Sequence, residues 1–93
     1  MSETDLVCKK VIFKGHVQGV GFRFKTHKIA TRYVVCGYVK NLISGEVELV
    51  AEGLPVDVER FIHDIHSSLD EYIDSSSEES LKVQSYSKFI ISR

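Results

Sequence analysis

Hydrophobic side chains alternate with polar ones near the start of the chain and then recur at helical spacing. The first segment runs from Leu6 to Lys14. It predicts a strand, because Val7, Val11 and Phe13 would share one side of an extended chain. From about residue 22 to residue 33 the spacing predicts a helix instead. The inward face of that helix consists of Phe22, Thr26, Ile29, Ala30 and Tyr33.

Two strands are expected next, from Cys36 to Leu42 and from Glu46 to Glu52. They are joined by Ile43-Ser44-Gly45, a short hairpin connection with glycine where a positive φ is expected. The pattern therefore predicts an antiparallel pair after the first helix.

A second helix is predicted after Gly53-Leu54-Pro55, because proline suits a first helical turn, where its missing N–H would be unpaired anyway. The weakest strand pattern is Glu71 to Ser77, running into a turn rich in serine and glutamate. Tyr86 to Ser92 predicts a clearer short strand. The sheet-facing residues of the second helix are Val58, Phe61, Ile62, Ile65 and Leu69.

The resulting order, βαββαβ with a short extra C-terminal strand, is that of an α+β ferredoxin-like sandwich. Such a sandwich has an antiparallel sheet with two helices on one face. The chain has 93 residues and neither repeats nor a linker, so we expect a single domain over residues 1–93.

Three glycines lie in the run Gly15-His16-Val17-Gln18-Gly19-Val20-Gly21-Phe22-Arg23, directly before the first predicted helix. Glycine allows φ values that aim several N–H groups at one centre, and a helix N-terminus adds unpaired donors and partial positive charge. Arg23 would hold a phosphate by two parallel hydrogen bonds. The loop therefore predicts an anion-binding cradle.

The charges are divided between the two halves of the chain. Residues 1–45 contain eight Lys or Arg and two acids, whereas residues 46–93 contain four and eleven. The cradle thus lies in a basic segment that suits an anionic ligand, unless folding mixes the two halves.

Composition limits the other classes of function. The hydrophobic content of 43% supports one small core, and no apolar run approaches the roughly 18 residues of a membrane span. The segment Met1 to Asp5 is polar and acidic, unlike a signal peptide, so we expect a cytoplasmic protein without membrane attachment. Cys8 and Cys36 lack the spacing of a metal or redox pair and are expected to be free, buried and inert. We expect His27, His63 and His66 on helix surfaces, with no metal and no cofactor.

The glycine-rich run resembles the first signature of the acylphosphatase family. Gly37-Tyr38-Val39-Lys40-Asn41, with Gly45, Val47 and Gly53, resembles the second. The ending Tyr86-Ser87-Lys88-Phe89-Ile90-Ile91-Ser92-Arg93 resembles the usual C-terminal strand of that family. The resemblance thus spans nearly the whole chain.

The resemblance implies a metal-independent acylphosphatase that hydrolyses small acyl phosphates to a carboxylate and inorganic phosphate. Arg23 is then the phosphate-binding arginine, Asn41 orients the attacking water, and the main-chain amides of residues 16–21 form the cradle. The family usually has glycine where the first helix ends, whereas this chain has Tyr33-Val34-Val35. We therefore expect the helix to end without a left-handed cap. A monomer is expected.

This chemistry needs few groups, because the leaving carboxylate has a conjugate acid of pKa about 4 and requires no general acid. Positioning and charge stabilisation would suffice, with a phosphate oxygen of the substrate taking the proton of the water. His16 is expected to tune the local charge rather than to act as a nucleophile. Gln18 either braces the loop or contacts substrate, and Thr26 packs under the loop.

Two other functions fit the same order of elements. An RNA-binding module would stack bases on aromatic side chains of its central strands. The first strand has only Phe13, and the third carries Glu46, Glu48 and Glu52, so we expect no nucleic acid partner. A non-catalytic relative that binds a small anion through the same loop is the other alternative.

Overall fold

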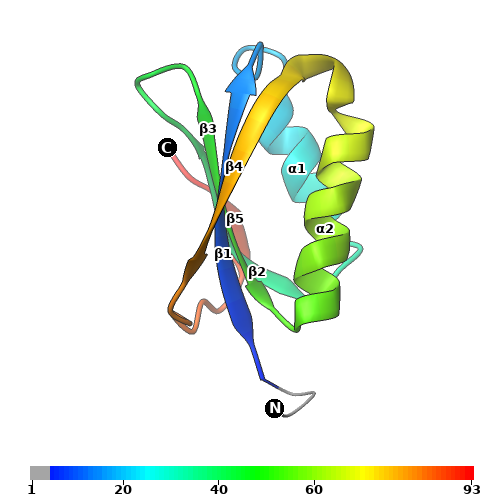
Figure 1. The fold of residues 1–93 in the computed structure, drawn as a ribbon, viewed down its shortest axis with the longest axis vertical. Coiled ribbons are helices and arrows are strands. Elements are labelled where there is room, and N and C mark those ends of the chain that lie inside the picture. Colours follow the sequence, from blue (N-terminus) through cyan, green and yellow to red (C-terminus); the bar gives the residue numbers. More distant parts are fainter. Residues whose placement is uncertain (1–4) are drawn as a thin grey trace.

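The computed structural model describes residues 5–93 (Figure 1). Residues 1–4 lie outside the described residues. They make up most of the polar N-terminal segment on which the expectation of no signal peptide rests. The elements are β1 (Val7–Gly15), α1 (Phe22–Ala30), β2 (Val35–Asn41), β3 (Val47–Gly53), α2 (Pro55–Ser68), a 3₁₀ turn (Asp70–Tyr72), β4 (Ile73–Leu81) and β5 (Phe89–Ile91).

The five strands form one sheet in the order β4-β1-β3-β2-β5, and both helices cover the same face of it (Figure 1). The predicted βαββαβ order is confirmed. The prediction of an antiparallel sheet is wrong at one edge, because β5 pairs parallel to β2. Since β4 and β5 are opposite edges, the chain between them must cross the sheet, and it then runs in the direction of β2.

The helix α1 ends at Ala30, three residues before the predicted end. The backbone amides of residues 31–33 donate to the carbonyl oxygens three residues earlier, at 3.0 to 3.3 Å. Thr31 remains right-handed, with φ of −65°, and its hydroxyl donates to the carbonyl of Lys28. The helix thus ends by tightening into a 3₁₀ turn, without a left-handed cap, as the sequence predicted.

The strand β4 is longer than predicted, because the Ser/Glu-rich segment expected to turn is itself part of the strand. The seven residues between its end residues are all exposed. An edge strand without a buried face shows no alternating hydrophobic pattern, and charged side chains on such an edge oppose pairing with other chains. Glu78 and Glu79 lie 3.5 and 3.7 Å from the ammonium groups of Lys9 and Lys10 on β1.

The hydrophobic core lies between the sheet and the two helices. All five predicted sheet-facing residues are buried, four of them in α2 and Leu69 at its C-cap, which confirms the helical pattern. Among the largest fully buried side chains are Phe13, Phe22, Phe61, Leu49 and Ile65.

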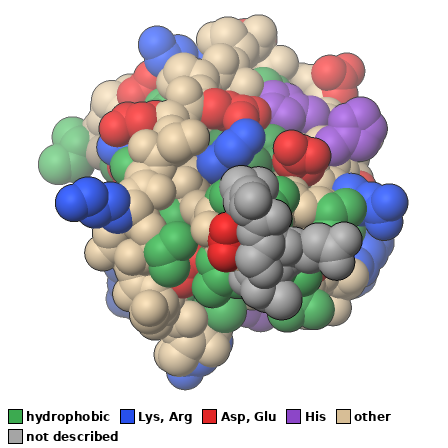
Figure 2. Space-filling model, turned by 60° about the horizontal axis from the view of Figure 1, so that its bottom comes forward, with side chains coloured by type: hydrophobic (Ala, Val, Ile, Leu, Met, Phe, Trp, Pro, Cys, Tyr) green, Lys and Arg blue, Asp and Glu red, His purple; other side chains and the backbone are tan. Residues whose placement is uncertain are grey.

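Folding mixes the charges that the sequence separates. Four ion pairs join a base from the first half to an acid from the second, including Lys14 with Glu46 and Arg32 with Asp64. At the end of the molecule where β1 begins, acidic and basic side chains are interspersed (Figure 2). Arg23 takes part in none of these four pairs, so the cradle keeps its cation.

Both cysteines are free, as predicted, but only Cys8 is buried, whereas Cys36 is half-buried. Burial raises the pKa of the Cys8 thiol, and the nearby Glu52 carboxylate raises it further. Of the three helix histidines, His63 is exposed, and His27 and His66 are half-buried against Phe89 and Phe13. No described helix has the length and apolarity needed to cross a membrane.

Candidate active site

Three segments meet at one end of the sheet, the upper end in Figure 1. They are the loop between β1 and α1 (residues 16–21), the end of β2 at the β2–β3 hairpin, and the residues that follow β5. The first two carry the two sequence signatures, which are therefore brought together by the fold.

The glycines give the loop its course. Gly19 and Gly21 have φ of 79° and 76°, values that only glycine adopts readily. Between them and β1, the side chain of Val17 is 1% exposed and fixes the loop to the core. Gly21 is the N-cap of α1, without a side-chain cap and without an acid in the first turn. The first amides of α1 therefore have no competing side-chain acceptor and are available to an anion.

Gly15 and Gly19 differ in the space around them, which gives a test of the loop. A Cβ on Gly15, where φ is 136°, would lie 2.4 Å from the carbonyl oxygen of Tyr72, whereas a Cβ on Gly19 would meet no atom within 4 Å. We expect Gly15→Ala to lower the free energy of unfolding by about 3 kcal/mol and Gly19→Ala by about 1 kcal/mol. Urea denaturation measures both. Equal losses would contradict this account of Gly15.

The side chain of Gln18 joins the loop to the hairpin. Its amide nitrogen donates to the carbonyl oxygens of Leu42 and Glu46, each at 2.8 Å. The sequence left open whether Gln18 braces the loop or contacts substrate. These two hydrogen bonds are those of a brace. This brace holds the glycine loop next to the end of β2.

Arg23 and Asn41 line one hollow of about 230 Å³. Arg23 is in the first turn of α1, is half-buried, and donates through Nη1 to the carbonyl oxygen of Ser92 at 2.9 Å. Asn41 is the last residue of β2, opposite Val47 of β3, and alternation places it on the helix side of the sheet. The complete lining is Val17, Gly19, Gly21, Phe22, Arg23, Phe24, Asn41 and Ile91.

The hollow includes some of the predicted cradle residues and not others. Gly15, His16, Gln18 and Val20 do not line it. Gly15 instead pairs with β4 at a register shift, while His16 is exposed.

Sequence reasoning missed Phe24, Ile91 and the carbonyl of Ser92. Phe24 is 66% exposed on the outward face of a helix. Phenylalanine is unusual at such a position, so its place in the helical pattern could have indicated a functional residue. Ser92 lies 69 residues from Arg23 and contacts it through the main-chain carbonyl, a group that every residue has, so the sequence could not predict this contact.

Thr26, which was expected to pack under the loop, is fully buried, and its hydroxyl has no hydrogen-bond partner among the described residues. Among residues 5–93, no group of three or more His, Cys, Asp or Glu side chains is placed to hold a metal ion.

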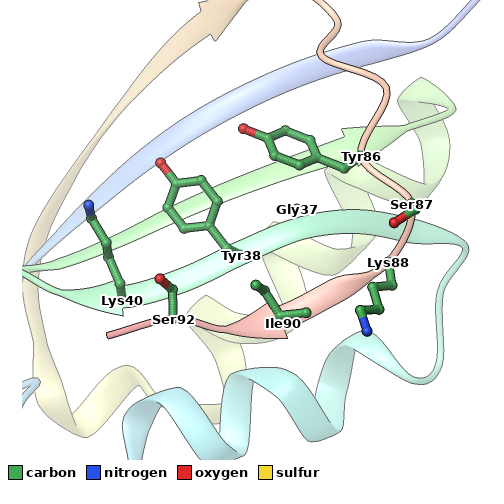
Figure 3. Close-up of a pocket in the computed structure, with 8 residues that line it drawn as sticks. All are labelled: Gly37, Tyr38, Lys40, Tyr86, Ser87, Lys88, Ile90 and Ser92. Carbon is green, nitrogen blue, oxygen red and sulfur yellow. The ribbon is translucent and has the colours of Figure 1, made fainter.

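A larger hollow, of about 410 Å³, lies beside β5 on the face of the sheet away from the helices (Figure 3). Tyr38 and Tyr86 point into it. It includes neither the glycine loop nor Asn41. The smaller hollow is the better candidate for an anion, because it combines a guanidinium group with the N-terminus of a helix.

Comparison with solved structures gives the class of protein that this fold defines. The acylphosphatase from Bacillus subtilis superposes with a TM-score of 0.84 at 26% identity, covering 94% of this chain and 99% of that one. An acylphosphatase from Coxiella burnetii superposes with a TM-score of 0.79 at 32% identity, covering 99% and 100% of the two chains.

Sequence comparison gives the family. The acylphosphatase family model matches residues 9–91, so this chain belongs to the acylphosphatase family, as its two signatures indicated. An acylphosphatase of Vibrio cholerae is 50% identical over 52 residues, which is 56% of this chain and 57% of the relative. The chain thus spans less than two thirds of the length of this curated relative.

Proposed function

We propose that this protein is an acylphosphatase, which hydrolyses the carboxyl–phosphate bond of small acyl phosphates to a carboxylate and inorganic phosphate. The observation that carries the proposal is the shared hollow of Arg23 and Asn41, which lie on different elements yet line the same space at the N-terminus of α1. Membership of the acylphosphatase family supports the same activity.

In the proposed complex the phosphate group lies in the loop 15–23. Amides of residues 16–21 and of the first turn of α1 donate to its oxygens, and Arg23 supplies the positive charge and two further donors. Carboxylate groups near a phosphate would repel it, and no Asp or Glu of residues 5–93 lines this hollow. Binding is therefore electrostatic and is prepared before the substrate arrives.

The proposed role of Asn41 is to hold the attacking water. Its side-chain carbonyl accepts one hydrogen bond from the water, which leaves the water oxygen directed at phosphorus. A phosphate oxygen of the substrate takes the proton, and the carboxylate leaves without a general acid because it is a weak base. The reaction then needs neither a covalent phosphoenzyme nor a metal ion.

The proposed setting follows from the sequence. We propose that the protein acts as a monomer in the cytoplasm on a small acyl phosphate, without nucleic acid or membrane partners. On the face of the sheet that an RNA-binding module would use, the acidic side chains of Glu48 on β3 and Glu46 just before it disfavour a polyanion, whereas Glu52, at 3% exposed, is buried.

Hydrolysis of benzoyl phosphate by the purified protein, with EDTA present, tests the activity. We expect metal-independent turnover at rates typical of enzymes, about 1 to 10³ per second. A folded protein that binds inorganic phosphate but leaves benzoyl phosphate intact would instead be a non-catalytic, anion-binding relative.

A further inference from the structure

One buried carboxylate holds the chain segment that crosses the open face of the sheet. This segment, residues 82–88, is called the strap below, and it joins β4 to β5. Glu52, near the end of β3, is only 3% exposed and lies on the face away from the helices. One of its oxygens accepts the backbone N–H of Gln84 and the other accepts that of Tyr86, the latter at 3.0 Å.

The backbone of the strap is shaped for this contact. Ser85, between the two donors, has φ of 59°, and it is the only described residue other than glycine with a positive φ. The left-handed conformation is unfavourable for a side chain, so it persists where other contacts require it. Here the amides on either side of Ser85 both donate to one carboxylate.

The strap leads directly into the strand that ends at the candidate active site (Figure 3). The amide of Gly37 donates to the carbonyl of Lys88 at 3.0 Å, and the amide of Ser92 donates to the carbonyl of Val39 at 2.8 Å. Between these two bonds, β5 has only three residues, so it has little pairing of its own. The carbonyl of Ser92, at its far end, accepts the hydrogen bond from Arg23.

Contacts on both faces of the sheet hold β5 in addition to its pairing with β2. On the helix side, the ring of Phe89 packs edge-on against that of Phe61, with centroids 5.4 Å apart, and it also lies against the ring of His27, at 6.1 Å. On the open face, the Glu52 carboxylate fixes the strap just before β5. Without the contact on the open face, only the packing of Phe89 and the pairing of a three-residue edge strand would hold the Ser92 carbonyl in place.

We infer that Glu52 is a positioning residue for Arg23, acting through the strap and the carbonyl of Ser92. This inference rests on the proposed role of Arg23 in binding phosphate. Glu52 lies at the opposite end of β3 from the site and touches no substrate. By holding β5 in register it keeps the guanidinium of Arg23 aimed into the hollow, which lowers the cost of ordering Arg23 when phosphate binds.

The test compares Glu52→Gln with Glu48→Gln. Glu48 is the control, because it lies on the same strand and face but accepts from the hydroxyl of Tyr38, at 2.7 Å. The ring of Tyr38 packs edge-on against that of Tyr86 in the strap, so Glu48→Gln disturbs the side-chain surroundings of the strap without removing the acceptor of its backbone amides. The probe is inorganic phosphate, titrated by calorimetry without turnover. We expect Glu52→Gln to raise the Kd for phosphate roughly tenfold, whereas Glu48→Gln leaves it within about twofold.

A double-mutant cycle separates positioning from general loosening of the fold. In the Arg23→Ala background, Glu52→Gln is expected to weaken phosphate binding no further, since the group that it positions is gone. A folded Glu52→Gln variant with the phosphate affinity of the wild type would overturn the inference. So would a full tenfold loss that persists in the Arg23→Ala background.

A second pair of variants tests the strap without altering the carboxylate. Ser85→Val disfavours the left-handed backbone and is expected to weaken phosphate binding as Glu52→Gln does, while Ser85→Gly preserves it. Equal phosphate affinity in the two variants would contradict the inference. Failure of the proposed function is a separate result, because a wild type that binds phosphate but hydrolyses no benzoyl phosphate leaves every one of these comparisons intact.

Discussion

Replacement of Arg23 by alanine is expected to weaken phosphate binding and to slow hydrolysis together. The guanidinium supplies the positive charge of the hollow and two donors in a planar fork, and phosphate keeps its charge from the bound substrate to the transition state. We expect the Kd for inorganic phosphate to rise about 10- to 100-fold and kcat with benzoyl phosphate to fall about 10²- to 10³-fold. Calorimetry and steady-state kinetics on one preparation measure both.

Lys28→Ala is the control for Arg23→Ala. Lys28 is an exposed base on the same helix and does not line the hollow. Its replacement by alanine removes one positive charge, as Arg23→Ala does. Both quantities should stay within about twofold of the wild type, because exposed charges are well screened. A loss of kcat in Arg23→Ala without any loss of phosphate affinity would contradict the binding role of Arg23.

Asn41→Ala should separate catalysis from binding. The amide is proposed to hold the attacking water and not the phosphate, so its loss removes an interaction that matters only as the reaction proceeds. We expect kcat to fall about 10²- to 10³-fold, with the Kd for phosphate within about twofold of the wild type. The comparison uses benzoyl phosphate for kcat and inorganic phosphate for Kd.

Lys40→Gln is the matched control for Asn41→Ala. Lys40 is adjacent in the sequence but points to the opposite face of the sheet, into the hollow drawn in Figure 3. It should keep most of the wild-type kcat. If Asn41→Ala lost phosphate affinity and kept kcat, Asn41 would be a binding residue and the proposed mechanism would fail.

Local sequence patterns predicted most of the fold, because they depend on the burial of one face of an element and on the backbone conformations that each residue allows. The spacing of Val58, Phe61 and Ile65 follows the burial of one helical face, which any sheet could provide. The glycine loop was also visible, since positive φ at Gly19 and Gly21 restricts the residue type at each position. Two signatures at separate places in the chain then identified the family.

The elements that were misjudged are those whose partners are distant. The segment 73–81 is a strand because β1 pairs with it, and its exposed serines and glutamates carry no hydrophobic period. The direction of β5 depends on where the strap crosses the sheet, and no residue within β5 specifies that. Local patterns predict neither feature, because the free energy that stabilises these two strands comes from pairing with residues far along the chain.

For this protein, the sequence by itself determined the order of elements, the conformation of the glycine loop and the family. Those features depend on residue type and short spacings. Only the tertiary structure decided which group Arg23 contacts and what holds the strap, because the carbonyl of Ser92 and the carboxylate of Glu52 reach their partners across 69 and more than 30 residues. A main-chain carbonyl has the same chemistry at every position, so only folding determines where it acts.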